Sequence, residues 1–293
     1  MQSLWMLAAS LFFALMAVCT KLSAANFGTF ELVFYRNVFG VVFLGAWILL
    51  THRQIGTRYF FSHIKRSFFG TFALTIWFWT LGLLPLGTSM TLNYTSPLYM
   101  ALIVSAIMMR RGEKPHLGLI AAVIVGFLGV VLALRPEIHA GQELPAMIGL
   151  TSGILSALAY MQIKSMTKLG EPDWRIVFYF SCFGTCWGLA GNFITVGSMT
   201  PVGLADVPAL LGIGASAVLA QICMTHAWGA GNMLLTSALQ FSAIVFAAVL
   251  GLLIFSEPIP LETAAGIALI IVSGVTATAM TKRASSKSAA AKK

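Results

Sequence analysis

The chain concentrates hydrogen-bonding side chains in one otherwise apolar stretch, residues 88–99, which reads TSMTLNYTSPLY. Thr95 and Tyr99 are four residues apart and share a helix face, and Asn93 lies on the adjacent stripe. An amide can donate and accept hydrogen bonds at once, and a tyrosine ring can contact an apolar side chain. These residue types predict a binding site for a small polar solute.

Pro97 interrupts this stretch. Proline has no N–H, so the carbonyl of Asn93 loses its helical partner and the helix bends. Two interpretations stay open. The bend could present a free carbonyl to a substrate, or it could be a packing kink whose carbonyl bonds a neighbouring Ser or Thr.

Further polar residues lie inside other apolar segments, where they are costly unless they face protein or water. Gln221 and Gln240 are the strongest of them, because an amide is harder to satisfy within its own helix than a hydroxyl. The other candidates for substrate contact are Ser237, Trp77, Trp79, Tyr160 and Gln162. For the two tryptophans, an interfacial aromatic belt is the alternative.

Three charged residues, Lys21, Glu31 and Arg36, fall near the outer ends of the first two apolar segments. Arg36 could act as an outer gate or contact a substrate carboxylate. It could instead form a structural ion pair with Glu31 while its stem lies along apolar surface. We favour the ion pair.

The sequence offers no set of residues for catalysis. All nine acidic residues lie in loops or near the ends of apolar segments, and no Ser–His–Asp set or phosphate-binding loop is present. Cys182 and Cys186 are four residues apart but lack His or carboxylate neighbours, which favours packing over metal binding. We expect no enzymatic activity, no metal and no cofactor. Proton-coupled carriers use a buried carboxylate, so we expect transport without one.

The composition is that of a membrane protein, with 58% hydrophobic and 9% charged residues and a mean hydropathy of +0.89. A bilayer core of about 30 Å needs roughly 20 apolar residues per helix. We therefore expect an all-α membrane protein with ten transmembrane helices, at residues 4–25, 30–50, 64–84, 88–109, 116–135, 146–167, 174–197, 204–226, 233–255 and 261–281.

Charge predicts the orientation of these helices. With a cytoplasmic N-terminus, fifteen of the 18 basic residues, Arg66 among them, fall on the cytoplasmic side. The positive-inside rule thus places both termini in the cytoplasm. A basic face beside anionic lipid also explains the pI of 9.7 without any nucleic-acid partner. We expect residues 282–293, which are small, polar and basic, to form a disordered cytoplasmic tail.

The chain also contains a repeat. Residues 33–40 read VFYRNVFG and residues 177–184 read VFYFSCFG, 144 positions later. This offset predicts two five-helix units, residues 1–135 and 146–281. Because five is odd, the second unit enters the membrane in the opposite orientation, and such inverted repeats are typical of transporters.

Several motifs carry a family resemblance: Thr95-Ser96-Pro97, Gly112 to Pro115 (GEKP), and Gly126 to Val130 (GxxGV), echoed by Ser256-Glu257-Pro258 and Gly274-Val275. With ten helices in two sets of five, the chain resembles the EamA-type branch of the drug/metabolite transporter superfamily over residues 1–281. Its length and aromatic content are similar to the YddG-like exporters of aromatic and other amino acids. Phe241-Ser242-Ala243 stands where a second TSP would be, so the two halves differ there.

Together these features predict a multi-pass transporter of the bacterial inner membrane. It would export amino acids or related small zwitterionic metabolites by alternating access. The alternatives are a carrier of nucleotide sugars or phosphorylated compounds, which needs cationic residues in the cavity, or a membrane scaffold that transports nothing. The expected partners are the small-molecule substrate and the lipid bilayer. The sequence leaves a monomer or a homodimer open.

Overall fold

The computed structural model describes residues 2–290 except 82, 85 and 257. Within these residues the regular structure is entirely helical, as the apolar segments predict. The elements are η1 (Gln2–Leu4), α1 (Trp5–Ser23), α2 (Thr29–Leu50), α3 (Phe60–Leu81), α4 (Leu86–Asn93), α5 (Ser96–Arg110), α6 (Leu117–Leu134), α7 (Glu143–Lys168), α8 (Asp173–Thr195), α9 (Val207–Ala230), α10 (Met233–Gln240), α11 (Ser242–Phe255) and α12 (Leu261–Ala290).

Nine helical segments in the described part of the chain are long and apolar enough to cross a membrane. Two of these segments each join a pair of helices, α4 with α5 and α10 with α11. α3 is not one of the nine, although it is 22 residues long and packs against α7 and α8. It is less apolar because it carries buried His63, Arg66 and Thr71 along its length.

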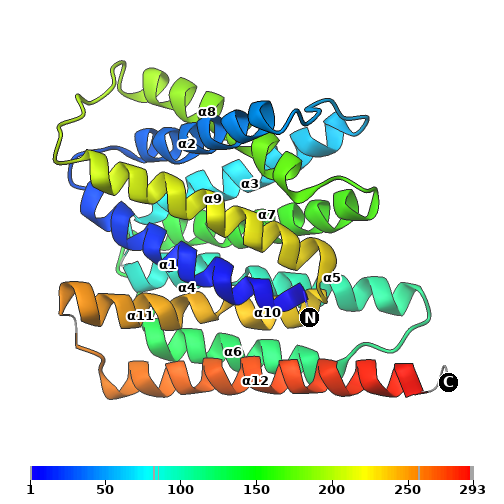
Figure 1. The fold of residues 1–293 in the computed structure, drawn as a ribbon. Helices are drawn as coiled ribbons and strands as arrows, with labels where there is room; N and C mark the ends of the chain where they lie inside the picture. The colour runs from blue at the N-terminus through cyan, green and yellow to red at the C-terminus, as the bar shows by residue number, and fades with distance from the viewer. Residues whose placement is uncertain (1, 82, 85, 257, 291–293) are drawn as a thin grey trace.

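The helices stack in layers (Figure 1). α6 and α12 pack against each other on one side of the bundle, and α2 and α8 pack against each other on the opposite side. α1 pairs with α9 and α3 with α7 in the layer beside α2 and α8. The broken helices α4–α5 and α10–α11 lie between that layer and the α6–α12 pair.

The repeated sequence motif lies where α2 packs on α8. A Cβ on Gly40 would lie 2.5 Å from Ser181 Oγ, and a Cβ on Gly184 would lie 2.5 Å from Asn37 Cγ. The glycines are 144 residues apart and so are Asn37 and Ser181, so the same contact occurs twice with the roles exchanged. The two helices therefore cross antiparallel, with each glycine making room for the other helix.

Two helices are interrupted in the middle of the bundle. α4 ends at Asn93, and Pro97 lies in the first turn of α5, where a missing N–H costs nothing. The second break lies between α10 and α11 at Phe241, with no proline. Ser242 Oγ donates to the Leu239 carbonyl at 2.7 Å there, which satisfies one backbone acceptor at the break.

Glycines set the distance between α6 and α12. A Cβ on Gly129 would lie 2.7 Å from the carbonyl oxygen of Gly266, and a Cβ on Gly266 would lie 2.5 Å from that of Gly129. Small residues permit such close approach of backbones. Gly129 and Gly266 thus pack against each other within one chain.

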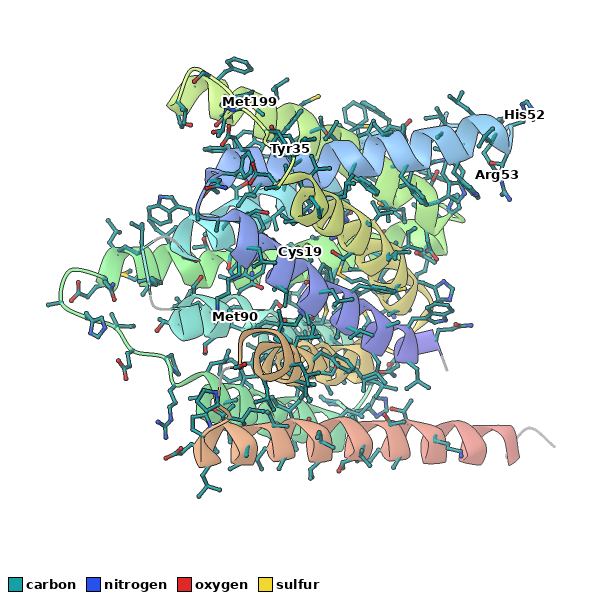
Figure 2. All side chains as sticks on the ribbon, turned by 60° about the vertical axis from the view of Figure 1, so that its left-hand side comes forward. Cys19, Tyr35, His52, Arg53, Met90 and Met199 are labelled. Carbon is teal, nitrogen blue, oxygen red and sulfur yellow. The ribbon has the colours of Figure 1, made fainter. Side chains whose placement is uncertain are left out.

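The start of α1 and the C-terminal end of α12 lie at the same end of the bundle (Figure 1). His52 and Arg53 mark one end of α2 (Figure 2). α12 continues to Ala290, so the structure gives residues 282–290 of the expected tail as helix. Its Ala, Lys and Arg residues are good helix formers, and they extend the preceding helix. Residues 291–293 lie outside the described residues.

Candidate functional site

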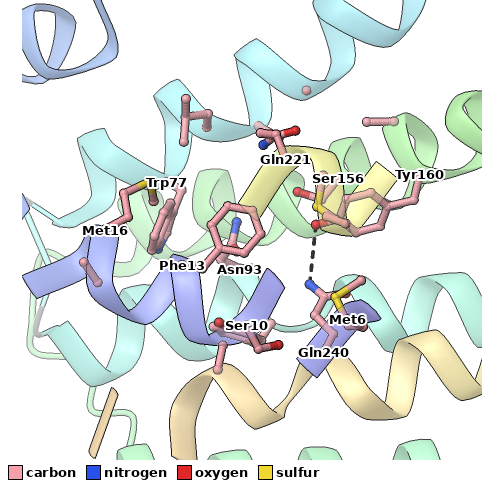
Figure 3. Close-up of a pocket in the computed structure, with 18 of the residues that line it drawn as sticks. Met6, Ser10, Phe13, Met16, Trp77, Asn93, Ser156, Tyr160, Gln221 and Gln240 are labelled. Atoms are coloured by element: carbon pink, nitrogen blue, oxygen red, sulfur yellow. Dashed lines mark hydrogen bonds between the residues drawn. The ribbon is translucent and has the colours of Figure 1, made fainter. Parts of the chain in front are cut away.

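A central cavity lies between the α1–α9, α3–α7 and α2–α8 pairs and the two broken helices (Figure 3). Its volume is about 110 Å³. Polar and aromatic side chains from both halves of the chain meet around it. Its lining includes Ser10, Phe13, Met16, Arg36, Arg66, Gly70, Trp77, Asn93, Tyr94, Ser156, Tyr160, Phe180, Gln221, Met224 and Gln240.

Five of the ten residues predicted to contact substrate line this cavity, namely Trp77, Asn93, Tyr160, Gln221 and Gln240. They come from α3, α4, α7, α9 and α10, so residues far apart in sequence meet at one place. Pro97 does not line the cavity, but it lies four residues after Asn93, at the start of α5.

The structure places the other five outside the cavity lining. Thr95 Oγ1 donates to the Leu92 carbonyl and Ser237 Oγ to the Met233 carbonyl, so both hydroxyls bond their own helical segments. Tyr99 packs against the largest apolar cluster, and Gln162 is half-buried. Trp79 is 40% exposed, which fits the interfacial alternative.

Gln240 joins the two halves at the centre of the bundle. Its Nε2 donates to Ser96 Oγ and to the Tyr160 hydroxyl, each at 3.4 Å (Figure 3). The Tyr160 ring is fixed in turn by stacking on Trp228 at 4.6 Å between centroids. Gln240 Oε1 is buried and has no hydrogen-bond partner in the described residues. This carbonyl oxygen is therefore available to an N–H group of a bound solute.

Asn93 and Trp77 line the cavity through α4 and α3. Asn93 Nδ2 donates to Ser152 Oγ on α7 at 3.3 Å, which fixes the orientation of the amide. Trp77 Nε1 is a buried donor with no partner in the described part of the chain. The cavity thus contains both an unpaired donor and an unpaired acceptor.

Arg66 is a cavity residue that sequence reasoning assigned to the cytoplasmic face. It is 2% exposed, and its Nη2 donates to Gln221 Oε1 at 3.0 Å. Its guanidinium carbon lies 4.1 Å from the centroid of the Phe180 ring. Gly70, one turn further along α3, makes room for it, because a Cβ there would lie too close to Arg66 Nη1.

Arg36 faces the same cavity from α2. It is 3% exposed, its Nε lies 3.4 Å from Met16 Sδ, and its guanidinium carbon lies 5.7 Å from the Phe180 ring centroid. The favoured ion pair with Glu31 is not formed. The Glu31 carboxylate instead accepts from the Gly28 N–H at 3.0 Å and from Thr200 Oγ1 at 2.9 Å.

Helix geometry explains why Arg36 and Glu31 do not form an ion pair. Glu31 is in the first turn of α2 and caps its N-terminus, whereas Arg36, five residues on, points to a different side of the helix. Lys21 is exposed in the last turn of α1 and does not line the cavity. Of the three charged residues predicted near the outer end, only Arg36 reaches the cavity.

A polar cluster holds the end of the bundle that carries the α2–α3 and α7–α8 connections. The Glu171 carboxylate accepts from Thr57 Oγ1, and it lies 3.3 Å from His63 Nε2 and 3.0 Å from Arg175 Nη1. Burial opposes the charge of Glu171, but the bonds from Thr57 and Arg175 outweigh it and lower the pKa of this carboxyl. The cluster joins the two halves of the chain with an ionised carboxylate at its centre.

Comparison with known proteins shows what this chain is similar to. Residues 1–135 match the EamA-like transporter family, which confirms the predicted resemblance. The chain is 27% identical over 271 residues to the pseudopaline exporter CntI of Pseudomonas aeruginosa, covering 90% of this chain and 91% of that protein. It is 24% identical to a riboflavin transporter of Vibrio cholerae, covering 92% and 90% of the two chains. It is 22% identical to an S-adenosylmethionine uptake transporter of Rickettsia conorii, covering 87% and 84%.

The fold also matches a crystal structure. The TM-score is 0.81 at 19% identity, over 94% of this chain and 98% of the other. At this identity the likeness shows the fold alone. These three relatives are transporters of small metabolites, and transporters are not enzymes.

Proposed function

We propose, from the match of residues 1–135 to the EamA-like transporter family, that this multi-pass membrane protein is a secondary transporter. It exports amino acids or related small zwitterionic metabolites across the bacterial inner membrane by alternating access. The similar proteins include an exporter and an uptake carrier, and their substrates are small metabolites. The proposal that the substrates are amino acids rests on the chemistry of the cavity.

The observation that carries this proposal is the pair of complementary groups in the cavity. Arg66 and Arg36 are cationic donors suited to a carboxylate, and Gln240 Oε1 is a buried acceptor suited to an ammonium. A zwitterion carries both of these groups. Trp77 and Phe180 supply apolar surface for the rest of the solute.

Alternating access is supported by the internal symmetry of the contacts. Gly40 meets Ser181 as Gly184 meets Asn37, and Gln240 bonds Ser96, which precedes it by 144 residues. Reciprocal contacts of this kind are expected where a two-fold axis relates the partners. We therefore infer two inverted repeats, residues 1–135 and 146–281, with the cavity between them. The position of the start of α1 and the C-terminal end of α12 at one end of the bundle agrees with the inferred cytoplasmic location of the two ends.

The test is transport by purified protein in liposomes. Vesicles loaded with a labelled neutral amino acid should exchange it for external substrate faster than vesicles without protein. The matched comparison is the variant Gln240→Ala, which removes the ammonium acceptor. If no amino acid in a panel of aromatic, aliphatic and charged members moves faster than in empty vesicles, amino-acid transport is wrong.

A second candidate is favoured by the two arginines. A carrier of phosphorylated metabolites or nucleotide sugars needs cationic residues in its cavity, and Arg36 and Arg66 meet that requirement. The same liposomes distinguish the two functions. Exchange of a sugar phosphate without exchange of any amino acid would favour this second function.

A further inference from the structure

Arg36 and Arg66 bring two positive charges into the middle of the bundle without acidic partners. Among the residues that the structure describes, no carboxylate lies within 4.0 Å of either guanidinium group. The carboxylates of Glu171, Asp173 and Glu262 pair with other cations. A cavity with two guanidinium groups and no acid carries a strong positive potential.

The protein does supply both guanidinium groups with some neutral contacts. Arg66 bonds the Gln221 oxygen, Arg36 approaches the Met16 sulfur, and both lie over the Phe180 ring. A ring face and a thioether give much less than the water that a buried guanidinium has lost. Arg66 Nε is also buried with no partner in the described residues. Charges left in this state inside a membrane protein mark a ligand site.

We propose that Arg36 and Arg66 form an anion site that makes the transporter prefer substrates with more acidic than basic groups. The ligand group is an oxyanion, either a second carboxylate or a phosphate, because the planar guanidinium matches both. This inference rests on the proposed function and narrows its substrate class. A zwitterion would neutralise one of the two arginines, whereas an amino acid with an acidic side chain would neutralise both.

Gly70 and Gln221 position Arg66 for this role. A Cβ at Gly70 would lie 3.1 Å from Phe180 Cε2 and closer still to Arg66 Nη1, so only glycine leaves the guanidinium in place. Gln221 accepts one of its hydrogen bonds and holds its plane. Gly70→Ala should therefore displace the anion site without changing its charge.

The experiment measures exchange in liposomes with solutes that differ in one acidic group. The pairs are glutamate with glutamine, aspartate with asparagine, and O-phosphoserine with serine. The wild-type protein should favour the acidic member of at least one pair by about ten- to hundredfold in half-saturation concentration, the range of a hydrogen bond to a charged group. Preference within the first two pairs identifies a carboxylate, and preference confined to the third identifies a phosphate.

Arg36→Gln and Arg66→Gln should each reduce that ratio, because each variant removes one charge from the site. Arg58→Gln, in the exposed α2–α3 connection, is the matched control and should keep the wild-type ratio. Gly70→Ala should weaken binding of the acidic member more than that of the neutral one. A Cβ at Gly56 would have nothing within 4 Å. Gly56→Ala should therefore change neither the binding of the acidic member nor that of the neutral member.

Two results would overturn the proposal while leaving the transporter in place. One is a wild-type protein that exchanges the neutral member of every pair as well as the acidic member. The other is a preference for acidic solutes that persists in both arginine variants. If an arginine variant fails to fold, the proposal is still tested by two measurements. They are the wild-type ratio of half-saturation concentrations and the change of that ratio in Gly70→Ala. Exchange of none of these solutes, while an aromatic or aliphatic amino acid still moves, would remove this inference alone.

Discussion

Gln240 shows how a single side chain connects the sequence to the site. Its amide N–H groups are used within the protein, on Ser96 and Tyr160, whereas its carbonyl oxygen is left unpaired. The two bonds from the N–H groups fix the orientation of the amide, so only its carbonyl oxygen is left to accept a hydrogen bond from a ligand. A ligand N–H group, such as an ammonium, is what this position can bind.

We therefore expect Gln240→Ala to raise the half-saturation concentration of an amino acid by about tenfold or more, since a hydrogen bond to a charged group is lost. The measurement is concentration-dependent exchange in liposomes. Tyr99→Phe is the control, because Tyr99 packs in an apolar cluster and does not line the cavity. An unchanged value in Gln240→Ala would remove this residue from the site.

The sequence predicted the amides of the site better than its charges. Asn93, Gln221 and Gln240 could be found because an amide inside an apolar segment needs an external partner. Arg66 was missed because it follows Lys65 near the start of α3, where arginines usually extend to the membrane surface. Lys65 is indeed exposed, but the next residue points in a direction about 100° away on a helix. The direction of one long side chain could not be read from the sequence.

At the level of the helices, close contact depends on the positions of the glycines. Gly129 on α6 faces the backbone carbonyl of Gly266, which cannot move aside. Gly274 on α12 has only the end of Leu239 at 3.5 Å, an ordinary contact. These two glycines belong to the same pair of helices but differ in how closely they are packed.

Gly129→Ala should accordingly destabilise the folded protein by about 1–3 kcal/mol, the usual cost of overpacking. Gly274→Ala should change stability by much less. Thermal unfolding in detergent, followed through tryptophan fluorescence, compares the two variants directly. Equal melting temperatures for both would show that α6 and α12 are not in close contact at Gly129.

The polar cluster around Glu171 joins the start of α3 to the start of α8 and gives a pH-dependent contribution to stability. Because the folded state lowers the pKa of Glu171, its contribution is present above the ordinary value of 4.5 and is lost as the pH falls through the lowered value. Glu171→Gln should lower the free energy of unfolding at neutral pH by about 1–3 kcal/mol. The difference from wild type should shrink in acid. A difference that stays constant from neutral pH to below pH 4.5 would contradict the assignment.

The breaks in the two central helices were predicted unequally. Pro97 marks the first break, because proline cannot continue the hydrogen bonding of a helix. Phe241 gives no such signal, and the second break was not predicted from it. The structure nevertheless interrupts the second helix at Phe241, which stands where Thr95 lies in the first break. α10 packs on α5, α6 and α12.

At the scale of the whole molecule, the inferred topology places the α8–α9 connection outside the cell and the α2–α3 connection inside. A membrane-impermeant maleimide should label Leu204→Cys, which is 93% exposed, on intact cells. It should label Gly56→Cys only after the membrane is opened. Both variants need a background in which the four native cysteines are replaced. The reverse pattern would invert the orientation and place both termini outside.

The two buried arginines also make the transport cycle sensitive to voltage. Each elementary charge moved across the membrane is worth about 2.3 kcal/mol per 100 mV. In a cell that is negative inside, an empty site with two positive charges is drawn toward the cytoplasm, where an exporter must load. A substrate with a net charge of −2 cancels those charges, so the loaded site moves outward without electrical work. An acidic amino acid, whose ammonium keeps its net charge at −1, halves that work. The membrane potential alone could then drive net export of an acidic metabolite, with no proton and no membrane carboxylate in the cycle.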